Sequence, residues 1–380
     1  MTWTDPALGA LAVGFLAVAW LTRSRLGAAA IAGTTVVFLA LVSPLSLAIL
    51  AGLGAAAYVA ARAGEGRRWR VAVVAALAAG VVVGFKWQHR LGQSILETSV
   101  LPLGLSFYSL RVVHYAVEAY KGTLPGHTPG AFARYLLFAP TFVAGPINRF
   151  AAFQRDERRR RWSSPLFAAG LERVLYGFVK IVVIGNQLIG FRLGHWLETT
   201  SALPAWLSAY LECLRYGLNL YVQFGGYSDV AIGLALAAGF RIGENFRWPF
   251  LARNLVDFWQ RWHITLAAWC RDYVFGPVAA ATRNAFLGVI ASMLVLGLWH
   301  ELSARYAVWG ICHGAGIAIC QAWRRVGFPP PRSPASRAVA WLGAWFVTQN
   351  FVILSFALTS TPRLGDAWVI LVKILTFAGR

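Results

Sequence analysis

Ionisable side chains gather between Asn254 and Gly314, whereas the rest of the chain is mostly apolar. They fall mainly in Asp257-Phe-Trp-Gln-Arg-Trp-His263 and in Leu298-Trp-His300-Glu301. Even on lenient insertion scales, a charged side chain at the centre of a bilayer costs about 2.5–3.5 kcal/mol, so such groups usually face a protein interior or a water-filled cavity. This stretch is therefore the predicted functional site. Its candidate residues are Asp257, Arg261, His263, Arg271, Asp272, Trp299, His300, Glu301 and His313.

The spacing of two histidines predicts that they share one substrate. Gly276-Pro277 and Thr282-Arg283-Asn284 indicate a turn between two apolar helices. Counting back from this turn to His263 gives about 13 residues, or roughly 20 Å of helix. Counting forward from it to His300 gives about 16 residues, or roughly 24 Å. In an antiparallel hairpin the two imidazoles would then lie at similar depth.

The composition excludes a soluble globule. Of the 380 residues, 58% are hydrophobic and 13% are charged, and the mean hydropathy is +0.58, so too little polar surface is available to face water. An all-α polytopic membrane protein is predicted, with roughly 10–12 transmembrane helices at about 20 residues per span.

The net charge of +20 does not indicate nucleic-acid binding, because the arginines form short clusters between apolar runs rather than one polar face. Such clusters are typical of cytoplasmic loops under the positive-inside rule. The cysteines have no metal-ligand spacing, so neither a disulfide framework nor a metal site is expected. They are Cys213, Cys270, Cys312 and Cys320.

Apolar runs locate the expected helices. Residues 7–22 form the first, and because Arg23 and Arg25 follow it, we expect a retained span with its N-terminus outside rather than a signal peptide. A break at Ser43-Pro44 divides residues 26–61 into two short spans. Further helices are expected near residues 71–88, 98–116, 170–191, 203–224, 338–358 and 366–378.

Residues 131–147 are apolar, yet the basic residues on both sides of them favour the cytoplasm. A single crossing cannot satisfy both, so a re-entrant segment is predicted around Ala139-Pro140 and Gly145-Pro146. Non-helical backbone at membrane depth is tolerated only where it is buried in protein or lines a cavity.

Two other polar features each allow two interpretations. The run Gln154 to Trp162 (QRDERRRRW) would be a solvated cytoplasmic segment near anionic headgroups, or a docking surface for an acidic carrier protein or for CoA phosphates. Asp229 interrupts an apolar run that contains Gly225-Gly226. It would be an intramembrane acid that contacts substrate, or the cap of a helix.

Several motifs together resemble the membrane-bound O-acyltransferase (MBOAT) family. The resemblance is narrowest to its bacterial branch, which includes the membrane proteins of alginate O-acetylation and of teichoic-acid D-alanylation. The motifs occur in the family's order over about residues 99–316. They are Leu101-Pro-Leu-Gly-Leu-Ser-Phe-Tyr108, Phe142-Val-Ala-Gly-Pro-Ile147, Gly226-Tyr-Ser-Asp-Val-Ala-Ile-Gly233, Gly239-Phe-Arg241, Glu244-Asn-Phe246, Asp257 to Thr265, Trp269-Cys-Arg-Asp-Tyr273 and Leu298-Trp-His300.

The resemblance implies a ring of helices with re-entrant segments around a central tunnel open to both membrane faces. It implies that the family's invariant histidine is His300, and that the family's second position, Asn or His, is His263. One integral membrane domain over residues 1–380 is expected, with N-terminal helices in 1–98, the catalytic core in 99–316 and C-terminal helices in 317–380. Gln260, Glu301 and Gln223-Phe-Gly-Gly depart from the bacterial pattern, which bears on the substrate more than on the chemistry.

Acyl transfer from a thioester to a hydroxyl needs a base and a group that stabilises the oxyanion. A histidine suits the base role, because its usual pKa of about 6.5 lies near the working pH. We therefore expect His300 to be the base and His263 to orient the acceptor or donate to the thioester carbonyl. Asp257 or Asp272 would fix a ring tautomer. Arg261 and Arg271 would pair with carboxylates or headgroups, or contact the donor.

His313 lies 13 residues beyond His300. At about 100° per residue, one continuous helix would point these two histidines to nearly opposite faces. A structural role, or a place at the tunnel mouth, is therefore expected for His313. His89, His114, His127 and His195 have no supporting residues around them.

The predicted function is a bacterial inner-membrane O-acyltransferase that moves an acyl group, acetyl first, from a cytoplasmic thioester to a hydroxyl of an extracytoplasmic glycan or glycolipid. Acetyl-CoA or an acyl carrier protein would be the co-substrate, with no tightly bound cofactor. D-alanyl or longer-chain transfer from an acyl carrier protein is the alternative. A transporter or channel is a further one, although no internal repeat supports it. A third possibility is that this protein only delivers the acyl group and that a separate periplasmic transferase completes the transfer.

Overall fold

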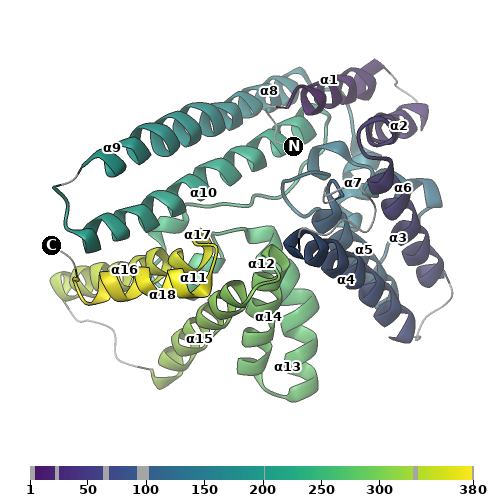
Figure 1. Ribbon diagram of the computed structural model, residues 1–380. Helices are drawn as coiled ribbons and strands as arrows, with labels where there is room; N and C mark the ends of the chain where they lie inside the picture. Colours follow the sequence, from purple (N-terminus) through teal and green to yellow (C-terminus); the bar gives the residue numbers. More distant parts are fainter. Residues whose placement is uncertain are drawn as a thin grey trace. The chain divides into compact units, whose positions relative to one another are not determined.

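The computed structural model describes residues 5–21, 25–62, 68–91, 102–200, 202–327 and 333–378 (Figure 1), which form helices and no strand. Arg23 and Leu101, mentioned above, lie outside these ranges. The chain divides into two compact units, residues 1–178 with 226–244, and residues 179–225 with 245–380. The expected subdivision into N-terminal, core and C-terminal parts stays a prediction.

The first unit contains short helices around a buried irregular segment. Its elements are α1 (Pro6–Leu21), α2 (Arg25–Val42), α3 (Pro44–Arg62), α4 (Arg68–Leu91), α5 (Leu105–Tyr120), α6 (Pro129–Leu136), η1 (Ala139–Thr141), α7 (Phe150–Arg159) and α8 (Ser164–Phe178). The helix α10 (Ala205–Ala237) belongs to this unit from Gly226 onward.

The second unit begins in the chain directly after α8. Its elements are η2 (Val179–Leu193), α9 (Gly194–Thr199), the first part of α10, η3 (Pro249–Leu251), α11 (Leu255–Trp259), α12 (Ile264–Cys270), η4 (Arg271–Phe275), α13 (Gly276–Thr282), α14 (Ala285–His300), α15 (Ala304–Val326), α16 (Pro334–Ser355), α17 (Ala357–Ser360) and α18 (Leu364–Leu375).

Among the described residues, helices occur near the expected positions, with two differences in their bounds. The helix expected near residues 98–116 begins at Leu105, with residues 98–101 outside the described ranges, and the helix expected near residues 203–224 continues to Ala237. The predicted break at Ser43-Pro44 separates α2 from α3, because proline cannot continue the preceding helix but suits the first turn of the next. Within the described ranges, four helical segments are long and apolar enough to cross a bilayer: Pro44–Arg62, Trp69–Trp87, Ser164–Thr199 and Pro334–Ser360. Shorter apolar helices are Pro6–Trp20, Ala29–Val42 and Ala285–His300.

These helices confirm the predicted all-α architecture with several membrane spans. The number of crossings, their orientation and the central tunnel stay predictions.

The segment predicted to re-enter the membrane is mostly buried and combines short helices with irregular backbone. Its helices are α6 and the short η1, and the side chains of Thr141 and Phe142 have no exposed surface. The buried guanidinium of Arg111 satisfies its backbone: Nη1 donates to the carbonyl of Tyr135 at 3.2 Å, and Nη2 donates to both oxygens of Thr141. Non-helical backbone is therefore buried in protein here, as the physics of unpaired peptide groups requires.

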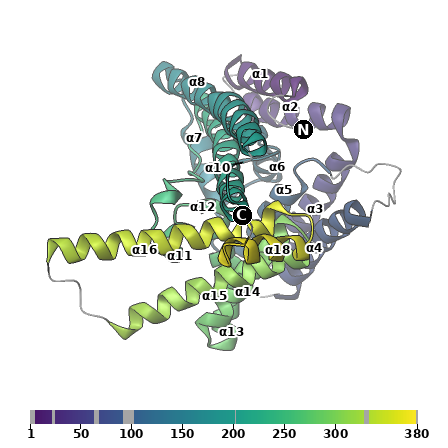
Figure 2. The ribbon, with the colours of Figure 1, turned by 60° about the vertical axis from the view of Figure 1, so that its left-hand side comes forward.

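In the second unit, α14 and α15 lie side by side in both ribbon views (Figures 1 and 2). Glycines permit this contact. A Cβ atom on Gly297 would lie 2.3 Å from the carbonyl oxygen of Tyr306, and one on Gly310 would lie 2.4 Å from that of Met293. The two backbones are therefore in direct contact, and no larger residue fits at either position.

Gly310→Ala is expected to lower the stability of the second unit. The added methyl group would force α14 and α15 apart, and overpacking of this kind costs about 1–3 kcal/mol. The matched control is Gly343→Ala on α16, where a Cβ meets nothing within 4 Å. Alanine there should be neutral or stabilising by up to about 1 kcal/mol. Thermal unfolding of both variants in nanodiscs tests this, and equal melting temperatures would contradict it.

Candidate active site

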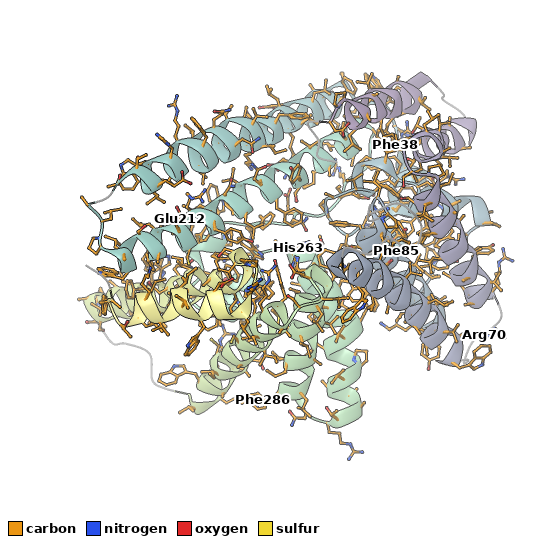
Figure 3. All side chains as sticks on the ribbon, in the orientation of Figure 1. Phe38, Arg70, Phe85, Glu212, His263 and Phe286 are labelled. Carbon is orange, nitrogen blue, oxygen red and sulfur yellow. The ribbon has the colours of Figure 1, made fainter. Side chains whose placement is uncertain are left out.

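His263 occupies the turn between α11 and α12, where it is the N-cap of α12 with φ 42° and ψ 52°. This left-handed conformation costs a residue with a side chain about 1–2 kcal/mol. Such strain persists only where the surroundings enforce it, and it is common at functional sites. The ring of His263, labelled in Figure 3, is 2% exposed.

The backbone around His263 is held by the extended segment that begins at Asn245, a residue with no exposed surface. Ile264 N donates to the carbonyl of Asn245 at 2.9 Å, and the Thr265 hydroxyl donates to its Oδ1 at 2.6 Å. On the other side of His263, the carbonyl of Arg261 accepts a hydrogen bond from Arg247 N at 2.9 Å. These bonds enforce the turn in which the histidine lies.

His300 is the last residue of α14. This helix is capped at its start by Asn284, whose side chain accepts hydrogen bonds from Phe286 N at 2.9 Å and Leu287 N at 3.3 Å. The ring of His300 lies 6.2 Å from that of His263, so the predicted juxtaposition is confirmed. The turn is at Arg283-Asn284, as expected. Gly276-Pro277 is not part of it, and that prediction is wrong: the proline sits in the first turn of α13, where its missing N–H costs nothing.

Both histidines line a pocket of about 90 Å³ whose walls are mainly aromatic and aliphatic. The side chains around the two histidines are Tyr216, Leu220, Phe224, Phe258, Trp262, Tyr306, Trp309, His313, Val352, Ser355, Phe356 and Thr359. The Nε2 atom of His263 is buried and has no hydrogen-bond partner in the described structure. A buried polar atom without a partner is costly, so a functional role is the natural explanation.

His313 lies in the same pocket, which corrects the expectation that it faces away from His300. The chain breaks at Glu301-Leu302-Ser303, so the two histidines are on different helices. Trp259 Nε1–H donates to Nδ1 of His313 at 3.3 Å, and Nε2–H of His313 then faces the Ser355 hydroxyl at 3.0 Å. Both ring nitrogens are engaged, so His313 is a neutral structural residue of the pocket wall, which agrees with the predicted structural role.

Asp257 and Asp272, the two carboxylates expected to fix a histidine tautomer, each form an ion pair with an arginine. Asp257 Oδ1 accepts from Arg261 Nε at 2.7 Å, and its Oδ2 accepts from Arg253 N at 3.3 Å. Asp257 therefore stabilises the start of α11 and does not fix a histidine tautomer, so that expectation is wrong for Asp257. Asp272 pairs with Arg271 at 2.9 Å, as the sequence suggested for these two residues.

Asp229 belongs to the first unit, within α10 and away from its ends, so the capping interpretation is wrong. It is 8% exposed and accepts from Arg173 Nη2 at 2.9 Å, while the same guanidinium also binds Glu244 at 2.6 Å. The charge of Asp229 is thus compensated by a partly buried ion pair with Arg173.

Trp299 and Glu301 flank the second histidine. The Trp299 ring is 4.9 Å from the His300 ring and 6.0 Å from the His263 ring. Glu301 forms an ion pair with Arg305, whose Nη1 donates to the carbonyl of Thr359 at 3.0 Å. Arg305 therefore ties the start of α15 to α17, and the carboxylate after His300 pairs with that arginine.

A second cavity of about 310 Å³ adjoins the same helices. Trp259 lines this larger cavity, which is also bordered by Gln260, Cys270 and Arg271. Arg271 is thus the predicted substrate-binding residue that borders this larger space. All four cysteines are free thiols, and no group of three or more metal-ligating side chains occurs among the described residues.

Sequence reasoning missed Trp309 and Phe224, whose rings help to form the pocket. Trp309 carries a signal that was available, because it precedes His313 by one helical turn on α15. Phe224 carries none, since its contact with the His263 ring at 4.6 Å joins distant parts of the chain.

A model of the membrane-bound O-acyltransferase family matches residues 67–357. The chain belongs to this family. It is 33% identical over 279 residues to a probable alginate O-acetylase of Pseudomonas aeruginosa, covering 72% of this chain and 51% of that protein. It is 32% identical over 297 residues to the teichoic acid D-alanyltransferase of Streptococcus thermophilus, covering 70% and 69%.

A peptidoglycan O-acetyltransferase of Helicobacter pylori is 26% identical over 307 residues, which cover 72% of this MBOAT chain and 56% of the relative. The chain spans about half the length of the alginate O-acetylases it matches, at 51%, 54% and 47% of three of them. The family membership confirms the resemblance drawn from the motifs around the two histidines.

A double-mutant cycle on Asn245 and Thr265 tests the clamp that holds the His263 turn. Asn245→Ala and Thr265→Val each remove the bond between the Thr265 hydroxyl and Oδ1 of Asn245, which should cost about 0.5–1.5 kcal/mol of unfolding free energy. The double variant should lose less than the sum, with a coupling of about 0.5–3 kcal/mol. Unfolding in detergent measures all three variants, and additive losses would contradict a direct bond.

Proposed function

We propose that this MBOAT protein is an O-acyltransferase of the bacterial inner membrane. It transfers a short acyl group, acetyl first, from a cytoplasmic thioester to a hydroxyl of an extracytoplasmic glycan or glycolipid. The observation that carries the proposal is the pair His263 and His300, with ring centroids 6.2 Å apart in one small pocket of a chain that belongs to an acyltransferase family.

The reaction assigns a separate task to each histidine. The acceptor oxygen attacks the thioester carbonyl carbon, while His300 takes the hydroxyl proton as general base. The C–S bond then breaks, and the same proton passes from His300 to the leaving thiolate sulfur. His263, whose Nε2 has no protein partner, orients the acceptor or donates to the carbonyl oxygen. No metal takes part in these steps.

The pocket supports acetyl over the alternatives. A space of about 90 Å³ bordered mainly by aromatic and aliphatic side chains favours a short acyl group over a long chain. A D-alanyl group is also short, but it carries an ammonium group. None of the side chains that line the pocket is a carboxylate, and an unpaired cation is costly to bury.

The proposed acyl transfer also requires an acyl donor and allows a partner protein. Acetyl-CoA, or an acyl carrier protein, supplies the thioester from the cytoplasmic side, and no cofactor remains bound. The lipid bilayer surrounds the chain. A periplasmic transferase is the candidate partner if the acyl group is passed on before it reaches the glycan.

The function is tested in a deletion strain by NMR of extracted envelope polysaccharide. Complementation with the wild type should restore an acyl signal whose spectrum names the group. His300→Ala should reduce it below detection, because loss of a general base costs about 10²–10⁴-fold in rate. The matched control is His195→Ala, since His195 is exposed on α9, where its ring stacks on that of Phe191.

Protein levels in the membrane are matched by immunoblot. Full restoration by His300→Ala would show that this histidine is structural and would overturn its role as the base. A wild type that restores no acyl signal would contradict the proposed function itself.

A further inference from the structure

Trp309 is a wall of the histidine pocket that the proposed reaction has not used. It lies on α15 and is 7% exposed. Its ring centroid is 6.2 Å from that of His300, and the ring centroids of His300 and His263 are likewise 6.2 Å apart. The candidate base therefore has His263 and Trp309 as neighbours at the same ring distance.

The indole nitrogen of Trp309 is buried without an acceptor. Nε1 has less than 1 Å² of accessible surface and no hydrogen-bond partner in the described part of the chain. An indole N–H can only donate, and leaving a buried donor unsatisfied costs about 1–3 kcal/mol. Trp259 next to it shows the ordinary solution, because its N–H donates to His313. Trp309 lacks such an acceptor although the two rings lie 5.8 Å apart.

We propose that Trp309 is a catalytic residue whose Nε1–H donates a hydrogen bond to the carbonyl oxygen of the acyl group. This inference rests on the proposed acyl transfer. As the acceptor oxygen forms its bond to the carbonyl carbon, the C=O electron pair moves onto oxygen. The N–H stabilises that oxyanion without giving up its proton. The pair returns when the C–S bond breaks, and the proton held by His300 goes to sulfur.

The surroundings suit this task. Preorganised donors in a water-excluded site stabilise developing charge far better than the same donors do in water. Phe258, Trp262 and Phe356 form part of the pocket wall. The His313 ring lies 4.7 Å from the Trp309 ring, but both of its nitrogens are already engaged in other hydrogen bonds, so it does not compete for the indole N–H. Because Nε1 itself is covered, the acyl group reaches it by displacing a neighbouring ring, so the donor becomes engaged only when substrate fills the pocket.

The test replaces the N–H alone. Trp309→3-benzothienylalanine, introduced by amber suppression, exchanges the N–H for sulfur and keeps the shape of the ring system, and Trp309→Phe is the simpler variant. The full-length protein in nanodiscs receives acetyl-CoA and unacylated envelope polysaccharide from the deletion strain, and thiol release gives kcat and KM. Both variants should lower kcat by about 10²–10³-fold. KM for acetyl-CoA should change little, since the bond strengthens in the transition state.

The matched control is the same pair of substitutions at Trp345, whose Nε1–H donates to the carbonyl of Phe250 at 2.8 Å outside the pocket. Those variants should keep the wild-type kcat. An active wild type with an equally active benzothienyl variant at position 309 overturns this inference and leaves the proposed function standing. A wild type that releases no thiol in the presence of acceptor overturns the proposed function, and the role of Trp309 with it.

Discussion

The direct backbone contact between α14 and α15 is the constraint on which the site depends. Gly297 and Gly310 have no side chains to separate the helices, so the end of one helix and the inner face of the other form a single rigid surface. His300 comes from the first helix, and Trp309 and His313 come from the second. A pocket of about 90 Å³ can hold a precise geometry only if its walls cannot slide past each other.

Hydrogen bonding divides the polar groups of this pocket into two kinds. Trp259, His313 and Ser355 form a chain of hydrogen bonds that ends at the carbonyl of Val352, so these groups are satisfied within the protein. Nε2 of His263 and Nε1 of Trp309 have no partner within the described protein. In a buried site a polar atom left open is costly, so the unsatisfied atoms, rather than the satisfied ones, indicate where a substrate contributes bonds.

The sequence predicted the features that depend on local chemistry. Proline at position 44 and asparagine at position 284 mark helix starts, and two histidines at matched distances from a turn meet in space. It did not predict features that depend on packing between distant segments. Whether Gly276-Pro277 turns the chain or opens a helix depends on the contacts of α13. The ion pair of Asp229 with Arg173, and the reversal that brings His313 beside His300, require helices whose arrangement no local pattern encodes.

The left-handed backbone at His263 also limits which amino acids this position can tolerate. Among residues other than glycine, asparagine, aspartate and histidine enter that region several times more often than others, and β-branched or bulky residues are true outliers there. The family resemblance gives Asn or His for the same position. Both have a side-chain nitrogen able to donate a hydrogen bond, and both accept this backbone. The left-handed φ angle thus limits which amino acids can occupy position 263, before the chemistry of their side chains is considered.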